Sequence, residues 1–419
     1  MLERMKGRLV ALLRWSERYT KTDMLYLTRG GFWSVIGQII ASVITLGLAV
    51  VIARFVPKDA YGSYKYILSF IAILSTFSLS GIGNAVFQST VHGYRSALKD
   101  GFLANLRWSL IIFIGALIGG LYYLLHGNTT IGISILFGGC LTPFFAGYNL
   151  YAPFFAAEKD FRAVAWYGDM LTNFIPALAI GIVAYLAPQP PYLVAAYFIT
   201  NTIVAMYAYE RAQKLYPTLD NRHDTGLISY SKHLSLMNIL TGIAGNIDQI
   251  LLFHYVGPVE LAIYNFAIAI PDQLKGPLKT LDSMLQAQFA RRSEKEIRST
   301  MRHKISLLSL FYLLVTILYI ILAPLIYHIF FSTYLDAVFY SQLYAISILI
   351  FGLGPAASFF AVKRRIKEQY IINVVSSVFQ IIAMIMGTVW WGLLGLIIAR
   401  IVARYVTTGL SYLLFILSS

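Results

Sequence analysis

Charged residues and cysteine are both scarce in this chain of 419 residues. Asp, Glu, Lys and Arg make up 12% of it, whereas soluble proteins contain about 25%, and the mean hydropathy is +0.68. This composition excludes an ordinary soluble domain of any size. The one cysteine, Cys140, excludes an intramolecular disulfide and a cysteine-based metal cluster. No His, Cys and Asp residues have the spacing of metal ligands, so we expect neither a metal nor another cofactor.

Long apolar segments recur from residue 30 to the C-terminus and predict an all-α polytopic membrane protein. We expect twelve transmembrane helices, at residues 28–55, 61–91, 101–125, 130–157, 161–187, 191–212, 227–256, 260–290, 302–330, 335–362, 367–389 and 391–417. Residues 1–27 are basic, and their apolar side chains share one helical face. This segment fits an amphipathic helix on a membrane surface and a basic tail that sets the topology equally well.

Positive charge is distributed unevenly along the chain, whose formal net charge is +14. Of the 33 Lys and Arg residues, 26 lie in the N-terminal segment and in the loops that lead into the third, fifth, seventh, ninth and eleventh helices. Cytoplasmic loops carry such an excess, so both termini are expected in the cytoplasm. The same distribution explains the net charge without a nucleic-acid partner.

Two segments 200 residues apart resemble each other and indicate an internal repeat. ARFVPKDAYGSYKY at residues 53–66 aligns without gaps on FHYVGPVELAIYNF at residues 253–266. We therefore expect an N-lobe at residues 28–212, a cytoplasmic linker at residues 213–226 and a C-lobe at residues 227–419. Six helices per repeat relate the two lobes by an axis along the membrane normal, with a central cavity between them.

The helix expected at residues 260–290 carries Asp272, Lys275, Lys279 and Asp282 within an arc of roughly 80°. Each charge facing lipid would cost about 2.5–3.5 kcal/mol at the bilayer centre. The charged stripe must therefore face protein or water. It can form internal salt bridges between packed helices, or it can line a polar translocation cavity.

Other expected helices carry polar faces that match this stripe. The polar residues that we expect to line the cavity are Gln38, Asn238, Asn265, Asn373 and Gln380. Arg400 and Arg404 are four residues apart on the last helix and repel each other unless an anion or water relieves them. Together with Lys275 and Lys279 they predict a site for an anionic head group, because guanidinium groups suit phosphate.

Asp248 lies deep in the helix expected at residues 227–256. A carboxylate at this depth either binds a coupling H⁺ or Na⁺ or forms a salt bridge. The same two alternatives apply to Asp272 and Asp282. We expect no catalytic residues, since no paired carboxylates and no nucleotide-binding motif occur.

The two repeated segments resemble the polysaccharide exporters of the MATE-like (MOP) flippase superfamily, in particular the Wzx type. Their first half reads R-x-L-G-P-x-x-Y-G-x-Y, to which Arg54, Tyr61, Gly62 and Tyr64 correspond, although Val56–Pro57 lacks the glycine. In the second half, DQILLFHYVGPVELAIYNFA matches the pattern D-x-x-L-L followed by G and L-G-x-Y-x-x-A and begins at Asp248. The resemblance adds Arg54 to the expected head-group site as a motif position.

This resemblance implies a flippase, not an enzyme. Such a protein would carry an undecaprenyl-pyrophosphate-linked oligosaccharide, such as an O-antigen or lipopolysaccharide repeat unit, across the bacterial cytoplasmic (inner) membrane by alternating access. The implied partners are the lipid-linked oligosaccharide, the membrane and polysaccharide polymerase machinery. The alternatives are an ion-coupled multidrug exporter of the same superfamily and a membrane-integral glycan polymerase or glycosyltransferase.

Overall fold

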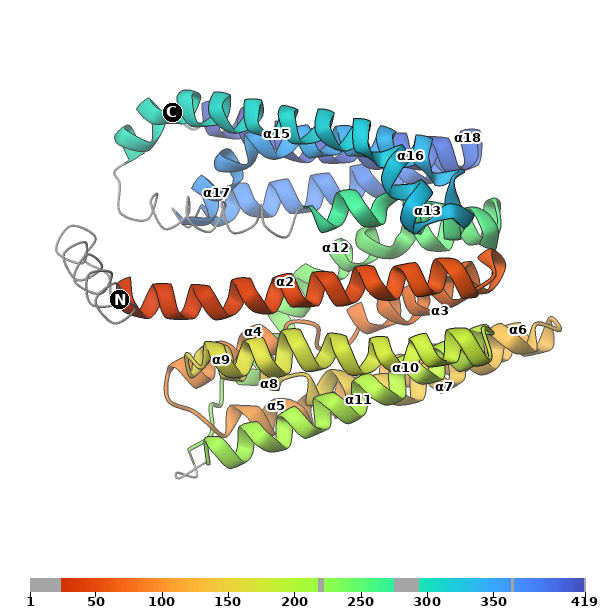
Figure 1. Cartoon of the computed structure of the whole chain (residues 1–419). Coiled ribbons are helices and arrows are strands. Elements are labelled where there is room, and N and C mark those ends of the chain that lie inside the picture. The colour runs from red at the N-terminus through yellow and green to blue at the C-terminus, as the bar shows by residue number, and fades with distance from the viewer. Residues whose placement is uncertain (1–23, 218–221, 275–293, 363–364, 418–419) are drawn as a thin grey trace, which may run out of the picture.

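The computed structural model describes residues 24–217, 222–274, 294–362 and 365–417, and the regular structure within these ranges is entirely helical (Figure 1). The first half contains α2 (Met24–Phe55), α3 (Lys58–Thr76), α4 (Ile82–Val91), α5 (Ala97–Trp108), α6 (Leu110–Leu125), α7 (Thr129–Tyr148), α8 (Tyr151–Ala157), α9 (Phe161–Ala163), the π-helix η1 (Val164–Leu171), α10 (Thr172–Leu186) and α11 (Pro190–Leu215). The second half contains α12 (Leu227–Tyr255), α13 (Pro258–Gln273), α15 (Glu294–Phe330), the 3₁₀ helix η2 (Ser332–Tyr334), α16 (Ala337–Ala345), the 3₁₀ helix η3 (Ile346–Leu353), α17 (Gly354–Val362) and α18 (Ile366–Leu417).

The prediction of an all-α membrane protein is confirmed, and the expected twelve spans agree with the helices observed. Nine helices in the described ranges are long and apolar enough to cross a membrane. The second expected span is interrupted between α3 and α4, and the eighth is described as far as residue 274. The last two spans are joined in α18, which kinks at Gly392. This glycine has φ of 57°, a conformation that other residues rarely adopt.

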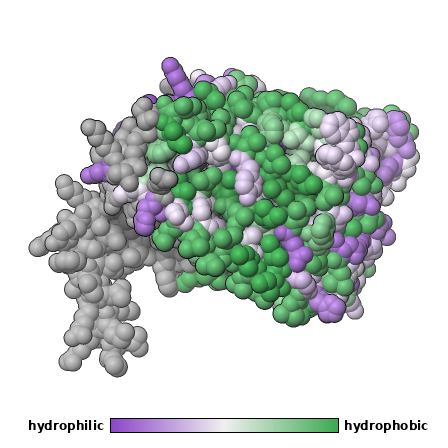
Figure 2. Space-filling view, turned by 90° about the horizontal axis from the view of Figure 1, so that it is seen from above, coloured by the Kyte–Doolittle hydropathy of each residue, from purple (hydrophilic) through white to green (hydrophobic). Residues whose placement is uncertain are grey.

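The exterior of the bundle is apolar over most of its length. Figure 2 shows a broad green band of hydrophobic side chains, with hydrophilic residues gathered toward one end of the view. Long apolar side chains of α6 and α15 point outward, as Ile118 and Ile321 do with 66% and 68% of their surface exposed. A soluble protein rarely exposes so large an apolar surface, whereas a lipid bilayer stabilises it.

Two tight helix hairpins lie at one end of the bundle, which we call the hairpin end. The chain turns between Phe55 and Lys58 in the first half and between Tyr255 and Pro258 in the second, so the offset of 200 residues is kept. The helices that follow, α3 and α13, pack directly on each other. A Cβ atom on Gly62 would lie 1.8 Å from the carbonyl oxygen of Pro258, and only glycine permits this approach.

Polar contacts join the two halves at the hairpin end. Lys58 Nζ lies 2.6 Å from the carboxylate of Asp336, which precedes α16. The Lys58 ammonium group is also the cause of a lowered pKa of the Asp336 carboxyl. Nearby, Tyr66 and Tyr123 are joined at 2.7 Å, and the Tyr123 hydroxyl lies 3.0 Å from His254 Nε2 of α12. These contacts hold the two halves together at this end.

Candidate functional site

A cavity of about 520 Å³ lies between α2, α3, α10 and α11 of the first half and α13 of the second half. We call it the central cavity. Its volume falls in the range of about 300–1,000 Å³ that is usual for ligand pockets. The uncharged polar and aromatic side chains in its wall are Thr45, Tyr61, Tyr64, Thr172, Asn173, Tyr197, Asn201, Asn265 and Gln273. Two charged residues, Lys65 and Asp272, complete this polar lining.

Lys65 brings a positive charge into the central cavity from α3. The fold places it there because α3 begins at Lys58 and runs inward from the hairpin end. Its Nζ lies 5.6 Å from the centre of the Tyr61 ring. Among the described residues it forms no ion pair with a carboxylate. A membrane-embedded cation without a protein counter-charge is costly, and an anionic ligand would lower that cost.

Asp272 of α13 also lines the cavity, and other groups of the second half engage it. Its carboxylate accepts a hydrogen bond from the Tyr344 hydroxyl at 3.0 Å and lies 3.4 Å from Arg404 of α18. Arg404 also donates to Ser347 Oγ at 2.8 Å, and its guanidinium lies 4.7 Å from the centre of the Tyr344 ring. The negative charge of Asp272 is therefore shared with Arg404, and no carboxylate of the described residues pairs with Lys65.

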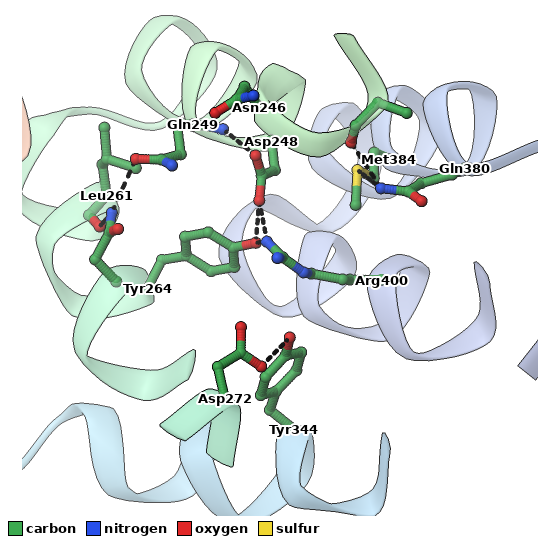
Figure 3. A network of polar contacts seen from close by, with 12 residues as sticks. Asn246, Asp248, Gln249, Leu261, Tyr264, Asp272, Tyr344, Gln380, Met384 and Arg400 are labelled. Atoms are coloured by element: carbon green, nitrogen blue, oxygen red, sulfur yellow. Dashed lines mark hydrogen bonds and ion pairs between the residues drawn. The ribbon is translucent and has the colours of Figure 1, made fainter. Parts of the chain in front are cut away.

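A second ion pair lies deeper in the second half. Figure 3 shows the Arg400 guanidinium and the Tyr264 hydroxyl converging on the carboxylate of Asp248, and both groups donate hydrogen bonds to it. The Asp248 side chain is 1% exposed, and its other oxygen accepts from the Gln249 backbone N–H at 2.9 Å. Breaking such a buried pair leaves an uncompensated charge, which makes this cluster a rigid element of the lobe.

These two ion pairs alter the expectation for the arginines of the last helix. The expected repulsion between Arg400 and Arg404 is relieved by Asp248 and Asp272, so a bound anion is not required for that purpose. Arg404 stays close to the central cavity through Asp272, which lines it. Arg400 is occupied by Asp248 in this conformation.

The other residues expected at the site are spread more widely. Arg54 is exposed at the hairpin end of α2, Gln38 is exposed along α2, Asn373 is exposed on α18 and Asn238 is half-buried on α12. Gln380 donates to the Ala244 carbonyl at 2.6 Å, which ties α18 to α12. Of the five residues expected to line the cavity, Asn265 lines the central cavity. Lys275, Lys279 and Asp282 lie outside the described residues, as does most of the expected N-terminal segment, and their roles stay predictions.

Lys65 is the functional candidate that the sequence reasoning did not include. It is one of the seven Lys and Arg residues that lie outside the N-terminal segment and the loops counted in the sequence analysis. The available signal was its position seven residues after Lys58, within a segment that the sequence predicts to cross the membrane. A cation at that depth is a candidate for function by default.

Comparison with known proteins identifies a family whose sequence profile matches this chain and solved structures that share its fold. The sequence profile of the family described as "Polysaccharide biosynthesis protein" matches residues 51–339, which is well over half of the chain. Among curated proteins, no sequence matches the chain significantly. The fold is similar to an inward-facing multidrug resistance MATE family transporter of the MOP superfamily, with a TM-score of 0.67, 13% identity, and 90% of this chain and 94% of that chain covered.

Two further solved structures bear on the conformation and on the fold. The lipid II flippase MurJ in an inward closed conformation matches with a TM-score of 0.65 and 16% identity, over 93% of this chain and 87% of that chain. An outward-facing MATE family transporter matches with a TM-score of 0.62 and 14% identity, over 94% and 95% of the two chains. At these identities the similarity concerns the fold alone.

Proposed function

Because the chain belongs to the family of polysaccharide biosynthesis proteins, we propose that it flips an undecaprenyl-pyrophosphate-linked oligosaccharide across the bacterial cytoplasmic membrane. The cargo would be an O-antigen or a similar repeat unit. Both termini would lie in the cytoplasm, and polysaccharide polymerase machinery would take up the product. The protein would act as a transporter and would not make or break a covalent bond.

The observation that carries this proposal is the positive charge of Lys65 in the central cavity, with which no carboxylate of the described residues pairs. A pyrophosphate offers several anionic oxygens to an ammonium group, and such charge-assisted hydrogen bonds are stronger than neutral ones. The hydroxyl and amide groups around Lys65 supply further hydrogen bonds to phosphate or sugar oxygens. The lipid tail would stay in the bilayer beside the lobes.

Contacts at the hairpin end support alternating access. The pair of Lys58 with Asp336 and the chain from Tyr66 through Tyr123 to His254 join the halves there. We infer that these contacts close the outer side and that they separate when the lobes rock outward.

A coupling H⁺ or Na⁺ would act at Asp248 only if it displaced Arg400. The carboxylate is buried and already bound by a guanidinium and a phenol. Ion coupling at this residue therefore requires the pair to open in another conformation. A cation gradient that accelerates transport, and that loses its effect in Asp248→Asn, would support this role.

Multidrug export is the second candidate, favoured by the fold shared with MATE transporters. Lys65 argues against cationic drugs, because a positive charge in the cavity repels them. Resistance to cationic drugs in cells that express the protein, without any effect on glycan assembly, would favour this alternative over flipping.

Reconstitution into liposomes tests the proposal directly. A labelled lipid pyrophosphate oligosaccharide is added, and its exchange between leaflets is followed with and without pH and sodium gradients. We expect exchange that depends on the protein and that is lost in Lys65→Met. The Lys232→Met variant is a matched control, because Lys232 is exposed and lies away from the central cavity. Exchange no faster than in protein-free liposomes would refute the proposal.

A further inference from the structure

We propose that a second cavity, lined by helices of the first half, binds the uncharged sugar units of the substrate. This inference rests on the proposed function and adds a site for the glycan to the phosphate site at Lys65. The second cavity has a volume of about 470 Å³ and lies between α3, α4, α5, α7, α8 and α11. We call it the N-lobe cavity.

The N-lobe cavity adjoins the central cavity. Leu68 of α3 and Tyr197 of α11 line both of them, so a single layer of side chains separates the two spaces. On α3, Lys65 precedes Leu68 by three residues, about one helical turn. A ligand whose phosphate contacts Lys65 would therefore reach the N-lobe cavity if the side chains of Leu68 and Tyr197 moved apart.

The lining of the N-lobe cavity suits carbohydrate rather than a charged ligand. No charged residue is found among the described residues that line it. Uncharged hydrogen-bonding side chains come from Ser75, Ser78, Ser80, Asn105, Thr142 and Asn149, beside aromatic rings. Sugars present apolar ring faces to aromatic side chains and hydroxyl groups to amides and hydroxyls. The aromatic and the hydrogen-bonding side chains of this lining can therefore both contact a sugar.

Two of these polar side chains are free to bind a ligand. Thr142 Oγ1 donates to the Gly138 carbonyl at 2.6 Å, and Ser78 Oγ donates to the Ser75 carbonyl at 2.8 Å, so their donors are engaged within the fold. In contrast, the side chains of Ser80 and Asn149 have no hydrogen-bond partner among the described residues, and both are exposed to the cavity.

An interruption of the helical chain borders this cavity and provides an independent reason for it to hold polar groups. The chain leaves helical structure between Thr76 and Ile82. Within a bilayer, irregular backbone is tolerated only where it is buried in protein or lines a hydrated cavity. Transporters build substrate sites at such discontinuous helices.

The described residues of this lining include no cation, and this predicts that the cavity binds neutral sugars in preference to acidic ones. An acidic sugar would bring a carboxylate into the N-lobe cavity, where none of the described lining residues could balance its charge. A neutral sugar loses only hydrogen bonds to water, which Ser80 and Asn149 replace. We therefore expect the units next to the pyrophosphate to be neutral.

The test measures binding of lipid pyrophosphates that carry no sugar, a neutral oligosaccharide or an oligosaccharide with an acidic sugar beside the phosphate. The full-length protein in nanodiscs is compared with the double variant Ser80→Ala/Asn149→Ala, the cavity-filling variant Ala146→Leu and the exposed control Ser306→Ala. We expect both cavity variants to bind the neutral oligosaccharide about tenfold more weakly than wild type, with unchanged binding of the sugar-free form.

The sugar-free form serves as the control for folding and for the phosphate site. Wild type should also bind the acidic oligosaccharide more weakly than the neutral one. If wild type binds all three ligands and the cavity variants bind them as wild type does, this inference fails and the proposed function stands. If the variants weaken all three equally, the N-lobe cavity holds the lipid tail, and the glycan site is refuted. If wild type binds no lipid pyrophosphate, the proposed function fails and this inference fails with it.

Discussion

Replacing Lys65 with methionine should separate transport from stability. The side chain keeps its length and loses its charge in a cavity where the described residues provide no carboxylate partner for it. At an effective dielectric constant of about 20, unit charges 4 Å apart attract by about 4 kcal/mol. Desolvation offsets part of this attraction, and a charge-assisted hydrogen bond contributes about 1.5–3 kcal/mol net. We therefore expect a lipid pyrophosphate to bind about 10- to 150-fold more weakly.

The same variant should fold at least as well as wild type, because it removes an uncompensated charge from the membrane. Binding is measured in nanodiscs by titration with lipid pyrophosphate, and stability by thermal unfolding in the same preparation. Lys65→Arg, which keeps the charge, should retain most of the affinity, and Lys232→Met should behave as wild type. If Lys65→Met keeps full affinity for lipid pyrophosphate, the phosphate site is elsewhere. If it unfolds at a lower temperature, the charge has a structural partner and the reasoning is wrong.

Three other predictions follow from particular contacts. Arg400→Met should destabilise the protein by about 3–5 kcal/mol by leaving Asp248 uncompensated, and Asp248→Asn in the same chain should restore part of the loss in thermal unfolding. Gly62→Leu should force α3 and α13 apart and abolish transport, while insertion into the membrane, measured by expression and purification, is kept. Lys58→Ala should favour the outward-open state in spin-label distance measurements, by no more than about 1 kcal/mol because Asp336 is half-exposed.

The ion pair between Lys58 and Asp336 at the hairpin end should also depend on pH, and the shift in pKa gives the direction. Lys58 lowers the pKa of Asp336, so the contact is fully present above the ordinary pKa of an aspartate and is lost as the pH falls through the lowered value. Acidification should therefore shift the spin-label distances of wild type in the same direction as Lys58→Ala does. A shift of equal size in the Lys58→Ala variant on acidification would show that another group is responsible.

Much of the fold could be predicted from the sequence because membrane helices are determined locally. Runs of about 20 apolar residues, with their backbone bonded internally, have few alternatives in a bilayer. The hairpin turns repeat at the same offset of 200 residues that aligns Val56 with Val256. The helices that follow these turns accordingly begin at Lys58 and Pro258. The break between α3 and α4 was missed because the apolar residues on both sides of it were read as one span, whereas the backbone of residues 77–81, which read FSLSG, leaves the helix.

The candidate site was predicted less well, since it depends on which helix faces meet. Composition and charge spacing were sufficient to identify a membrane protein with deep charges, and to place Asp248, Asp272, Arg400 and Arg404 among them. Only the tertiary structure decided that Arg400 meets Asp248, 152 residues away, and that Arg404 meets Asp272. Because these pairs satisfy each other, Lys65 is the cation in the central cavity for which the described residues supply no carboxylate partner. It lies on another helix, and no single-helix pattern reveals its partners.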